Sequence, residues 1–588
     1  MQIPTRLTIA WLRHAYESGS ATPREVVARI LERCADTVDY NVWIAPPSEQ
    51  ALEPYLAQLD QTSPSADKPL WGVPFVIKDN IDLDGVPTTA ACPAYTYTPA
   101  QSATVVAKLV DAGAIPLGKA NLDQFATGLV GVRSPYGECK NALDPRLISG
   151  GSSSGSAVSV ALGLAAFSLG TDTAGSGRVP AALNRLVGFK PPLGSWSTRG
   201  VVPACASLDC VTVFANTLED AMTVDGVARG YDEGCPYSKK YAAPQGAALP
   251  AAICIPDAEP EFYGEFAQRY REGWRASLER IGRLASKAGV EVRTMDCSYL
   301  NKAASVLYDG PWVAERWADL GGFVEAHPGE VFPVTEKILR SGARDGLSAE
   351  SLFNAMHFLQ ECRHRVNAEL DDAVLVMPTC GGTFTRAQVD ADPIAANSKM
   401  GLYTNHCNLC DLAALAIPGD DSYPGLPFGI TAFARADSQR LLEGFARAYR
   451  ASACVRVAVC GKHMRGFEYH AQLLDAGAEY LGAYATAPSY RLFVLDEKAQ
   501  RPGLLKVREG GASIEVEVYA FPALDFGAFV ERIPAPLSFG KIELSDGNVV
   551  EGMLVERASV LDEAGTTLEG TVEITAQGSY RSWAAQEP

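Results

Sequence analysis

The sequence predicts an α/β sandwich domain followed by a smaller, β-rich domain. Three observations lead to this fold class: strand and helix patterns alternate early in the chain, the middle is mostly helical, and the last part consists of strand candidates between turn residues. A chain of 588 residues is too long for one hydrophobic core. We therefore expect two domains, residues 1–452 and residues 453–588, divided where the composition changes.

The first domain begins with a well-marked helix. Thr22 and Glu25 form a predicted capping box with proline at the first helical position, and apolar residues follow at helical spacing. Short buried strands are predicted at residues 71–77 and 114–117. The apolar, small-residue stretch Val158–Leu169 predicts a helix between two serine-rich loops.

The remaining elements follow in two groups. Glu259–Leu370 is mostly helical, Ala373–Thr379 is a core strand, and a helix over Ser438–Ala451 closes the first domain. Leu412–Ile417 is also predicted as a helix. The strand candidates of the second domain are Val455–Val459, Tyr490–Leu495, Leu504–Val507, Ser513–Ala520 and Thr571–Ala576.

The composition is ordinary for a globular enzyme and argues against several other classes. Hydrophobic residues make up 47% and charged residues 20% of the chain. A net charge of −18 without a basic stripe argues against nucleic-acid binding, and no apolar run predicts a membrane span. The first residues lack a secretory pattern, and the 14 cysteines have no regular spacing, which indicates reduced thiols in the cytoplasm.

Two serine-rich loops and one upstream lysine give the strongest chemical signal. A serine hydroxyl is a poor nucleophile until a base removes its proton. A relay of two serines and a lysine supplies such a base without histidine. The segments are Gly150–Ser156, Gly170–Pro180 and Gly72–Asn80, the last of which contains Lys78.

These segments resemble the amidase signature family, whose hydrolases and amidotransferases attack amide carbonyls. The resemblance extends from about Lys78 to Gly429 and implies an α/β/α sandwich with a mixed sheet. It implies Ser176 as the nucleophile and Ser152 as a bridging serine. It also implies a cis bond between Gly151 and Ser152, with Lys78 as the terminal base.

The residues themselves agree with these roles. Lys78 can act as a base only when much of it is neutral, and burial lowers the pKa of a lysine from about 10.4. The apolar stretch Val73–Ile77 favours such burial. The backbone N–H groups that can converge on a developing oxyanion belong to Thr173, Ala174, Gly175 and Ser176.

Three other motifs suggest competing functions. Gly113–Ala120 nearly matches a phosphate-binding loop, but alanine replaces the residue that holds magnesium, so we favour a strand and a turn. Gly151–Gly155 matches a nucleophile elbow without the apolar strand that should precede it. His406–Cys410 resembles half of a zinc site, and no second cysteine pair completes it, so we favour buried thiols.

Three further segments resemble the allophanate hydrolases within the amidase family. In these enzymes a tyrosine and an arginine at a similar spacing recognise the substrate carboxylate. The segments are Thr127–Gly137, Ser197–Cys205 and Leu307–Arg316.

This narrower resemblance implies Tyr308, Arg316 and Gly128 as substrate-binding residues. Arginine offers a charged fork that matches a carboxylate, and tyrosine adds a neutral donor. The spacing of Tyr308 and Arg316 predicts both side chains on one helix face, two turns apart. In the alternative, Arg316 pairs with Glu315 or Asp319 and Tyr308 packs in the core.

The second domain resembles the C-terminal domain of allophanate hydrolases, which is similar to gamma-glutamylcyclotransferase-type barrels. In some members this domain is implicated, through a histidine, in decarboxylation of the first product. Glu468 and Tyr469 depart from the family pattern. The segments that carry the resemblance are Val457–Gly466, Ala487–Leu492 and Arg501–Leu504.

The candidate residues in this domain are His463 and His470, with Lys462 and Arg465 for carboxylate binding. A histidine with a pKa near 6.5 can donate a proton at neutral pH. The alternative, that the domain mainly supports assembly or partner docking, stays open.

The sequence therefore predicts an allophanate hydrolase that cleaves a small anionic amide to ammonia and N-carboxycarbamate, without metal or organic cofactor. The alternatives are an amidase acting on malonamate-like or neutral small amides, a subunit that passes ammonia to a partner, and a non-catalytic binding module. We further expect a cytoplasmic homodimer with a functional link to a biotin-dependent urea carboxylase, and no nucleic-acid or membrane partner.

Overall fold

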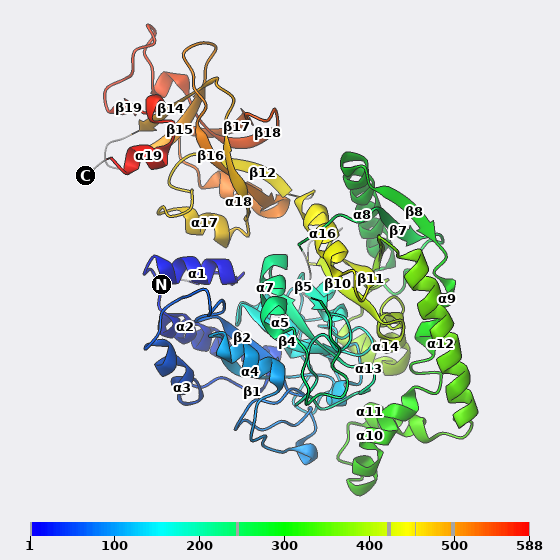
Figure 1. Ribbon diagram of the computed structural model, residues 1–588. Helices are drawn as coiled ribbons and strands as arrows, with labels where there is room; N and C mark the ends of the chain where they lie inside the picture. Colours follow the sequence, from blue (N-terminus) through cyan, green and yellow to red (C-terminus); the bar gives the residue numbers. More distant parts are fainter. Residues whose placement is uncertain (1–2, 243–245, 420–424, 453, 496–499, 587–588) are drawn as a thin grey trace. The chain divides into compact units, whose positions relative to one another are not determined.

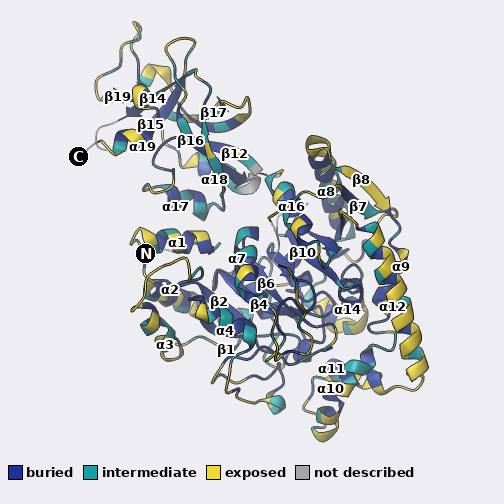
Figure 2. Cartoon of the chain, in the orientation of Figure 1, coloured by how far each residue is buried: buried dark blue, intermediate teal, exposed yellow. Residues whose placement is uncertain are grey.

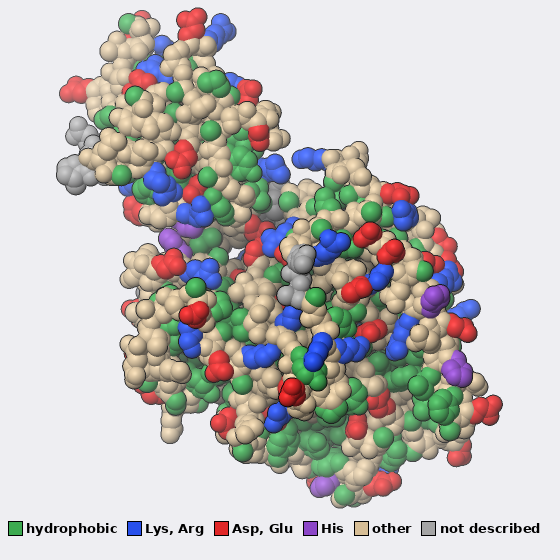
Figure 3. Space-filling model, viewed as in Figure 1, with side chains coloured by type: hydrophobic (Ala, Val, Ile, Leu, Met, Phe, Trp, Pro, Cys, Tyr) green, Lys and Arg blue, Asp and Glu red, His purple; other side chains and the backbone are tan. Residues whose placement is uncertain are grey.

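The computed structural model describes residues 3–242, 246–419, 425–452, 454–495 and 500–586. The chain divides into two compact units, built mainly from Ala21–Tyr449 and from Arg450–Pro588. Among the described helices, none combines the length and the apolar character that crossing a bilayer requires. On the face shown in Figure 3, acidic and basic side chains are interspersed.

In the described part of the larger unit, 11 strands form one sheet (Figure 1). Parallel and antiparallel neighbours are mixed, which confirms the predicted α/β class and mixed sheet. In sheet order the strands are β1 Trp43–Ala45, β3 Ile115–Ala120, β2 Pro74–Lys78, β4 Phe167–Asp172, β6 Cys210–Ala215, β5 Val187–Lys190, β10 Leu412–Pro418, β11 Gly429–Arg435, β9 Ala373–Pro378, β7 Ala252–Pro256 and β8 Glu291–Met295.

Helices surround this sheet, and most residues of its central strands are buried (Figure 2). The α-helices are α1 Ile9–Glu17, α2 Pro23–Asp36, α3 Glu49–Leu59, α4 Thr104–Asp111, α5 Ser154–Ala161, α6 Val179–Leu183, α7 Leu218–Ala228, α8 Ala267–Ala288, α9 Ser298–Ser305, α10 Val313–Ala326, α11 Pro333–Arg340, α12 Ala349–Glu369, α13 Arg386–Ala391, α14 Pro393–Met400, α15 His406–Leu409 and α16 Gln439–Ala451. The 3-10 helices are η1 Val38–Tyr40, η2 Pro93–Tyr95, η3 Gln124–Ala126 and η4 Ser341–Ala343.

Several local predictions are confirmed. The capping box at α2 is present, because Thr22 Oγ1 accepts from Glu25 N at 3.3 Å and Glu25 Oε2 accepts from Thr22 N at 2.8 Å. The predicted strands at residues 71–77 and 114–117 correspond to β2 and β3. The core strand after the helical middle segment is β9, and α16 covers nearly all of the predicted closing helix.

One predicted helix extends too far along the chain, and another is wrong. Within Val158–Leu169, α5 ends at Ala161 and β4 begins at Phe167. Gly163 between them has a φ of 69°, a conformation that favours glycine and ends helices. Leu412–Ile417 lies in strand β10. Short apolar runs without polar positions carry no period that separates a buried helix from a buried strand.

The smaller unit contains a second sheet, which confirms the predicted β-rich character. The predicted strands are β12 Cys454–Val459, β14 Tyr490–Leu495, β15 Arg501–Lys506, β16 Glu515–Pro522 and β19 Thr571–Glu573; the strands that sequence patterns missed are β13 Glu479–Ala485, β17 Leu537–Glu543 and β18 Val549–Val555. Each missed strand contains a glycine, which weakens a strand pattern. The helices of this unit are α17 His470–Asp475, α18 Ala523–Glu531, α19 Tyr580–Ala584, η5 Arg557–Ser559 and η6 Thr575–Gln577.

Strand β2 positions the lysine singled out by the sequence. It lies between β3 and β4 and runs parallel to both, so the three carboxyl ends meet at one edge of the sheet. Lys78 ends β2, and Asp172 ends β4 at this edge. Helix α5 packs against all three strands, which places Ser152, just before that helix, at the same edge.

A buried ion pair stabilises this edge. Lys119 Nζ lies 3.1 Å from Asp79 Oδ1, and both side chains are 0% exposed. Thr89 donates to Asp79 Oδ2 through its N–H at 3.0 Å, and Lys119 donates to Thr88 Oγ1 at 2.9 Å. The lysine of the phosphate-loop-like segment is therefore held by an aspartate inside the core.

We expect Asp79→Asn to lower the free energy of unfolding by about 3–5 kcal/mol, because it leaves the Lys119 charge buried without its partner. Equilibrium urea unfolding followed by tryptophan fluorescence measures this change. Glu53→Gln is the matched control, since it breaks an exposed pair with Arg24 and should barely move the midpoint. Similar midpoints for the two variants would show that the Asp79–Lys119 pair does not stabilise the sheet.

Candidate active site

The amine of Lys78 is buried against two hydroxyl groups. Lys78 Nζ lies 2.7 Å from Ser152 Oγ and 2.7 Å from Thr171 Oγ1, and the residue is 0% exposed. Burial lowers the pKa of Lys78 to about 7, so that much of this amine is neutral and able to accept a proton at neutral pH. Three carboxylates act against this shift without outweighing it, those of Asp123, Asp209 and Asp172.

The bond between Gly151 and Ser152 is cis, as the family resemblance implies. A Cβ on Gly151 would lie 2.0 Å from Asp123 Oδ2, so only glycine fits there. The same Oδ2 accepts from Gly131 N at 3.0 Å, and Asp123 N donates to Ser152 O at 3.0 Å. Asp123 therefore fixes the loop that carries Ser152.

Ser176 lies in the chain between β4 and α6. Its Oγ lies 3.4 Å from Gly128 O, and the residue is 3% exposed. Within the described residues, no hydrogen bond joins Ser176 to Ser152. The structure thus brings Lys78 to Ser152 and places Ser176 beside Gly128.

The loop Thr173–Ser176, which the sequence predicts to stabilise an oxyanion and which we call the oxyanion loop, is held from two sides. Thr173 Oγ1 donates to Asp209 Oδ1 at 2.5 Å, and a Cβ on Gly175 would lie 2.2 Å from Thr404 Oγ1. Over the described part of the chain, the backbone N–H groups of the last three loop residues donate to no protein acceptor. They can therefore serve as donors to a developing oxyanion.

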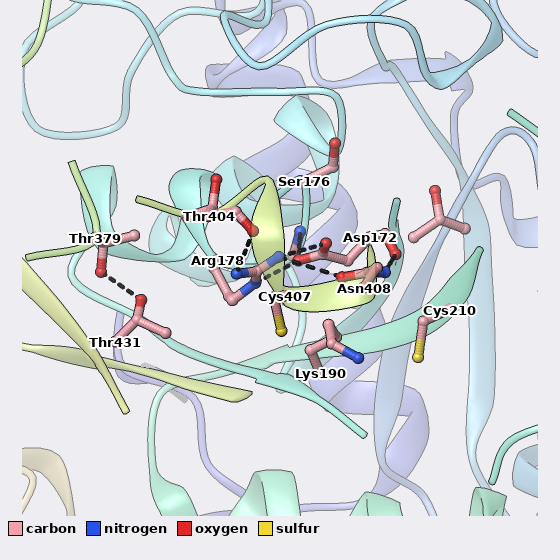
Figure 4. Close-up of polar contacts among 12 residues, drawn as sticks. Asp172, Ser176, Arg178, Lys190, Cys210, Thr379, Thr404, Cys407, Asn408 and Thr431 are labelled. Atoms are coloured by element: carbon pink, nitrogen blue, oxygen red, sulfur yellow. Dashed lines mark hydrogen bonds and ion pairs between the residues drawn. The ribbon is translucent and has the colours of Figure 1, made fainter. Parts of the chain in front are cut away.

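A buried ion pair anchors the base of the oxyanion loop (Figure 4). Arg178 Nε and Nη2 donate to Asp172 Oδ2 and Oδ1 at 2.8 and 2.9 Å, with both side chains 0% exposed. Arg178 Nη1 donates to Thr404 O at 3.1 Å, and Asn408 Nδ2 donates to Asp172 O at 2.7 Å. Burial acts to raise the pKa of Asp172, but Arg178 outweighs it and lowers that pKa. The loop is therefore fixed by a fully charged pair.

Asp209 links the oxyanion loop to a second segment. Its Oδ2 accepts from Ala204 N at 2.8 Å and from Cys205 N at 3.1 Å. Burial raises the pKa of Asp209 to about 6, although these hydrogen bonds favour the carboxylate. The site residues that the sequence did not single out are Thr171, Asp123, Asp172, Arg178 and Asp209.

Tyr308 and Arg316 meet, although the prediction that they share a helix is wrong. Arg316 lies on α10 and is 1% exposed, whereas Tyr308 lies in the turn before it, because Pro311 cannot continue a helix. Arg316 Nη2 donates to Tyr308 Oη at 3.3 Å, and Arg316 Nη1 donates to Thr127 Oγ1 at 3.0 Å. Gly128 follows Thr127, and a Cβ there would lie 2.4 Å from Asp123 Oδ2.

The alternative partners of Arg316 are engaged elsewhere or are not in ion-pair contact. Glu315 Oε1 accepts from Ser207 N at 2.7 Å, and its Oε2 accepts from Ser207 Oγ at 2.6 Å. Within the described residues, Arg316 forms no ion pair with an acid, and its Nε has no hydrogen-bond partner. A buried guanidinium of this kind is suited to bind a ligand carboxylate.

The smaller unit contains a pocket of about 270 Å³. Three of its lining residues are cations, Lys462, Arg501 and Arg532. The sequence analysis did not single out the two arginines, because they lie far along the chain from Lys462. The polar residues that line it are Lys462, His463, Tyr469, Gln472, Arg501 and Arg532.

His463 faces this pocket, but its protonation state differs from the expected one. Burial lowers the pKa of His463 to about 4, although a contact of 3.2 Å between Nε2 and Gln472 Oε1 acts to raise it. At neutral pH this histidine is therefore uncharged. His470 and Arg465 are not among the residues that line the pocket; Arg465 instead contacts Glu517 through Nε at 3.3 Å.

The segment His406–Cys410, which resembles half of a zinc site in the sequence, is buried in the larger unit. Cys407 and Cys410 are both free, buried thiols, as favoured from the sequence. His406 is 0% exposed, and burial lowers its pKa to about 3.

Comparisons with known proteins agree with this geometry. The Amidase family matches residues 25–442, and the family described as the allophanate hydrolase C-terminal domain matches residues 455–585. The chain therefore belongs to the amidase family and carries the C-terminal domain of allophanate hydrolases, which confirms the resemblance and the predicted amidohydrolase class.

Three individual relatives illustrate the match. Allophanate hydrolase from Kluyveromyces lactis is 35% identical with a TM-score of 0.70, covering 98% of this chain and 99% of that one. Urea amidolyase from Lachancea kluyveri is 37% identical over 96% of this chain, which spans 32% of that longer protein. A glutamyl-tRNA(Gln) amidotransferase subunit from Treponema pallidum (strain Nichols) is 32% identical over 62% of this chain and 78% of its own length.

We expect a neutral fluorophosphonate probe to label Ser176 at a rate that rises about tenfold between pH 6 and pH 8, because a base with a pKa near 7 loses its proton in that range. Peptide mass spectrometry locates the label. Ser176→Ala should abolish labelling at that site, whereas Ser207→Ala, on an exposed loop, should not. A flat pH profile would contradict the assignment of Lys78 as the base.

Proposed function

We propose that this enzyme hydrolyses the terminal amide of allophanate to ammonia and N-carboxycarbamate. The observation that carries the proposal is that the buried amine of Lys78 lies in hydrogen-bond contact with Ser152. The same site contains a buried guanidinium, that of Arg316, which forms no ion pair with an acid among the described residues. The likeness to an allophanate hydrolase over nearly the whole chain supports it. We assign the hydrolysis to residues 1–452.

The chemistry follows from the arrangement of the three residues. Ser176 Oγ attacks the amide carbon while its proton passes through Ser152 to the neutral amine of Lys78. The N–H groups of the oxyanion loop stabilise the negative charge on the amide oxygen. The proton then returns through Ser152 to the leaving nitrogen, which departs as ammonia. Water, activated by the same relay, cleaves the acyl-enzyme and releases N-carboxycarbamate.

Arg316 and Tyr308 are the proposed receptor for the carboxylate end of the substrate. A bidentate guanidinium matches the geometry of a carboxylate, and its charge does not depend on pH in the working range. Gly128 brings its carbonyl to Ser176 and follows the residue that Arg316 contacts, so it connects the receptor to the nucleophile.

Three alternatives are weaker on specific grounds. An amidase for neutral amides has no use for the buried charge of Arg316, although malonamate-like anions would fit it equally well. A protein that passes ammonia onward finds support in the amidotransferase relative, but that match leaves 38% of this chain uncovered, since it covers 62%. A non-catalytic module does not require an amine whose pKa is lowered to about 7.

We assign residues 453–588 to the next step, the decarboxylation of N-carboxycarbamate. In that step the C–N bond breaks, carbon dioxide leaves, and the nitrogen takes up a proton to give carbamate. The three cations of the pocket suit a dianion. The negative charge of that bound dianion would raise the pKa of His463 from about 4 toward a proton-donating range. The alternative role in assembly stays open.

The cellular setting follows from the same proposal. The urea amidolyase relatives support a role in urea degradation and a functional link to a biotin-dependent urea carboxylase that supplies allophanate. The 13 cysteines whose side chains the structure describes are free thiols, which suits a cytoplasmic enzyme. The homodimer stays a prediction, and sedimentation of the full chain measures it.

We expect Arg316→Gln to lower kcat/KM for allophanate by the equivalent of about 2–5 kcal/mol, because one partner of a desolvated charge pair is lost. Biuret, the neutral isostere, should lose far less. Ammonia release from a panel of allophanate, malonamate, biuret and simple amides measures both effects, with Arg340→Gln, an exposed side chain at the end of α11, as control. Equal losses on charged and neutral substrates would exclude carboxylate recognition, and an inert wild type would exclude allophanate.

We expect His463→Gln to leave the release of the first ammonia unchanged and to delay carbon dioxide release, because the proposed proton donor to the leaving nitrogen is gone. Early time courses that follow the two gases separately measure the delay. His470→Gln, outside the pocket, is the control and should behave like the wild type. Superimposable curves for His463→Gln and wild type would mean that this unit does not catalyse decarboxylation.

A further inference from the structure

A second buried guanidinium lies next to the Arg316 receptor. Arg133 is 1% exposed, and its Nη1 donates to Thr127 O at 2.9 Å while its Nη2 donates to Pro393 O at 2.7 Å. Burial lowers the pKa of Arg133, the charges of Asp123 and Tyr308 act to raise it, and the nearby charge of Arg316 acts to lower it further. The two cations are therefore close enough to repel each other.

Both guanidiniums bind the same residue. Arg133 holds the carbonyl oxygen of Thr127, and Arg316 holds its hydroxyl at 3.0 Å. The next residue, Gly128, contacts Ser176 Oγ through its carbonyl at 3.4 Å. A single two-residue stretch thus connects both cations to the nucleophile.

The charge balance of this region is unusual. Within the described residues neither Arg133 nor Arg316 forms an ion pair, and the Nε of each is buried without a hydrogen-bond partner. The nearby carboxylate of Asp123 is taken up by backbone N–H groups, at 3.0 Å from Gly131 N and 2.9 Å from Arg133 N. Two buried like charges cost free energy unless a negative charge joins them.

We propose that Arg133 is a specificity-determining residue for anionic amides, an inference that rests on the proposed function. It supplies the second positive charge at the carboxylate end of the site. The ligand class is a small amide that carries a carboxylate. A neutral isostere gains nothing from the second charge.

The competing explanation is that Arg133 only ties the Thr127 loop to the start of α14 through Pro393 O. The two explanations differ in what a charge-removing substitution does. Loss of a clamp disturbs the nucleophile and lowers kcat on every substrate. Loss of a charge raises KM for an anion and leaves the nucleophile intact.

The test compares Arg133→Gln and Arg133→Lys in the full chain, with separate kcat and KM for allophanate. We expect Arg133→Gln to raise KM at least about tenfold, the scale of one lost charge-assisted interaction, with kcat within about threefold. Arg133→Lys keeps the charge and should restore most of the affinity. Labelling of Ser176 by the neutral fluorophosphonate should be unchanged in both variants, because the probe does not need the anion receptor.

Each other outcome has a definite meaning. A fall in kcat and in labelling for both variants would mean that Arg133 only ties the Thr127 loop to Pro393, and it would overturn the proposal. An unchanged KM in Arg133→Gln would also overturn it, while leaving the allophanate assignment intact. A wild type that does not hydrolyse allophanate would instead remove the proposed function on which the inference rests.

Discussion

The chemistry of this site depends on the exclusion of water from one lysine. Lys78 ends a central strand, has parallel neighbours on both sides, and points its amine at the hydroxyls of Ser152 and Thr171. An ammonium group in such a place loses its hydration, so the neutral amine is favoured near pH 7. The nearby carboxylates would keep it charged if they formed close ion pairs with it. Asp172 instead forms an ion pair with Arg178, and Asp123 accepts hydrogen bonds from backbone N–H groups.

The same ion pair and hydrogen bonds hold the reacting groups in position. Asp123 sets the loop of Ser152, while Asp172 and Asp209 hold the oxyanion loop at its two ends. Glycines lie at two places where side-chain oxygens approach the backbone too closely for a Cβ, Gly151 beside Asp123 and Gly175 beside Thr404. Preorganised donors of this kind stabilise developing charge without reorganisation during the reaction.

Much of the fold and the contact between Lys78 and Ser152 could be predicted from the sequence, because serine-rich loops and an isolated lysine segment carry a strong local signal. Asp172 and Arg178 lie in one of those loops, so their spacing was a usable clue. Asp123 and Asp209 were not predictable, since a single aspartate looks the same whether it caps a turn or organises a site. Tyr308 and Arg316 were paired correctly, but the proline between them sends the chain into a turn. Only part of the pocket of the smaller unit could be predicted from the sequence, because Arg501 and Arg532 reach it from distant segments of the chain.

The central claim is that Lys78 is the base for Ser176, and the most direct measurement is the rate of first ammonia release from allophanate by Lys78→Met in the full chain. We expect a loss of at least about 10²-fold, the scale of general base catalysis, together with disappearance of the rise through pH 7. A Lys78→Met enzyme that keeps more than about a tenth of the wild-type rate, with the same pH dependence, would contradict the claim.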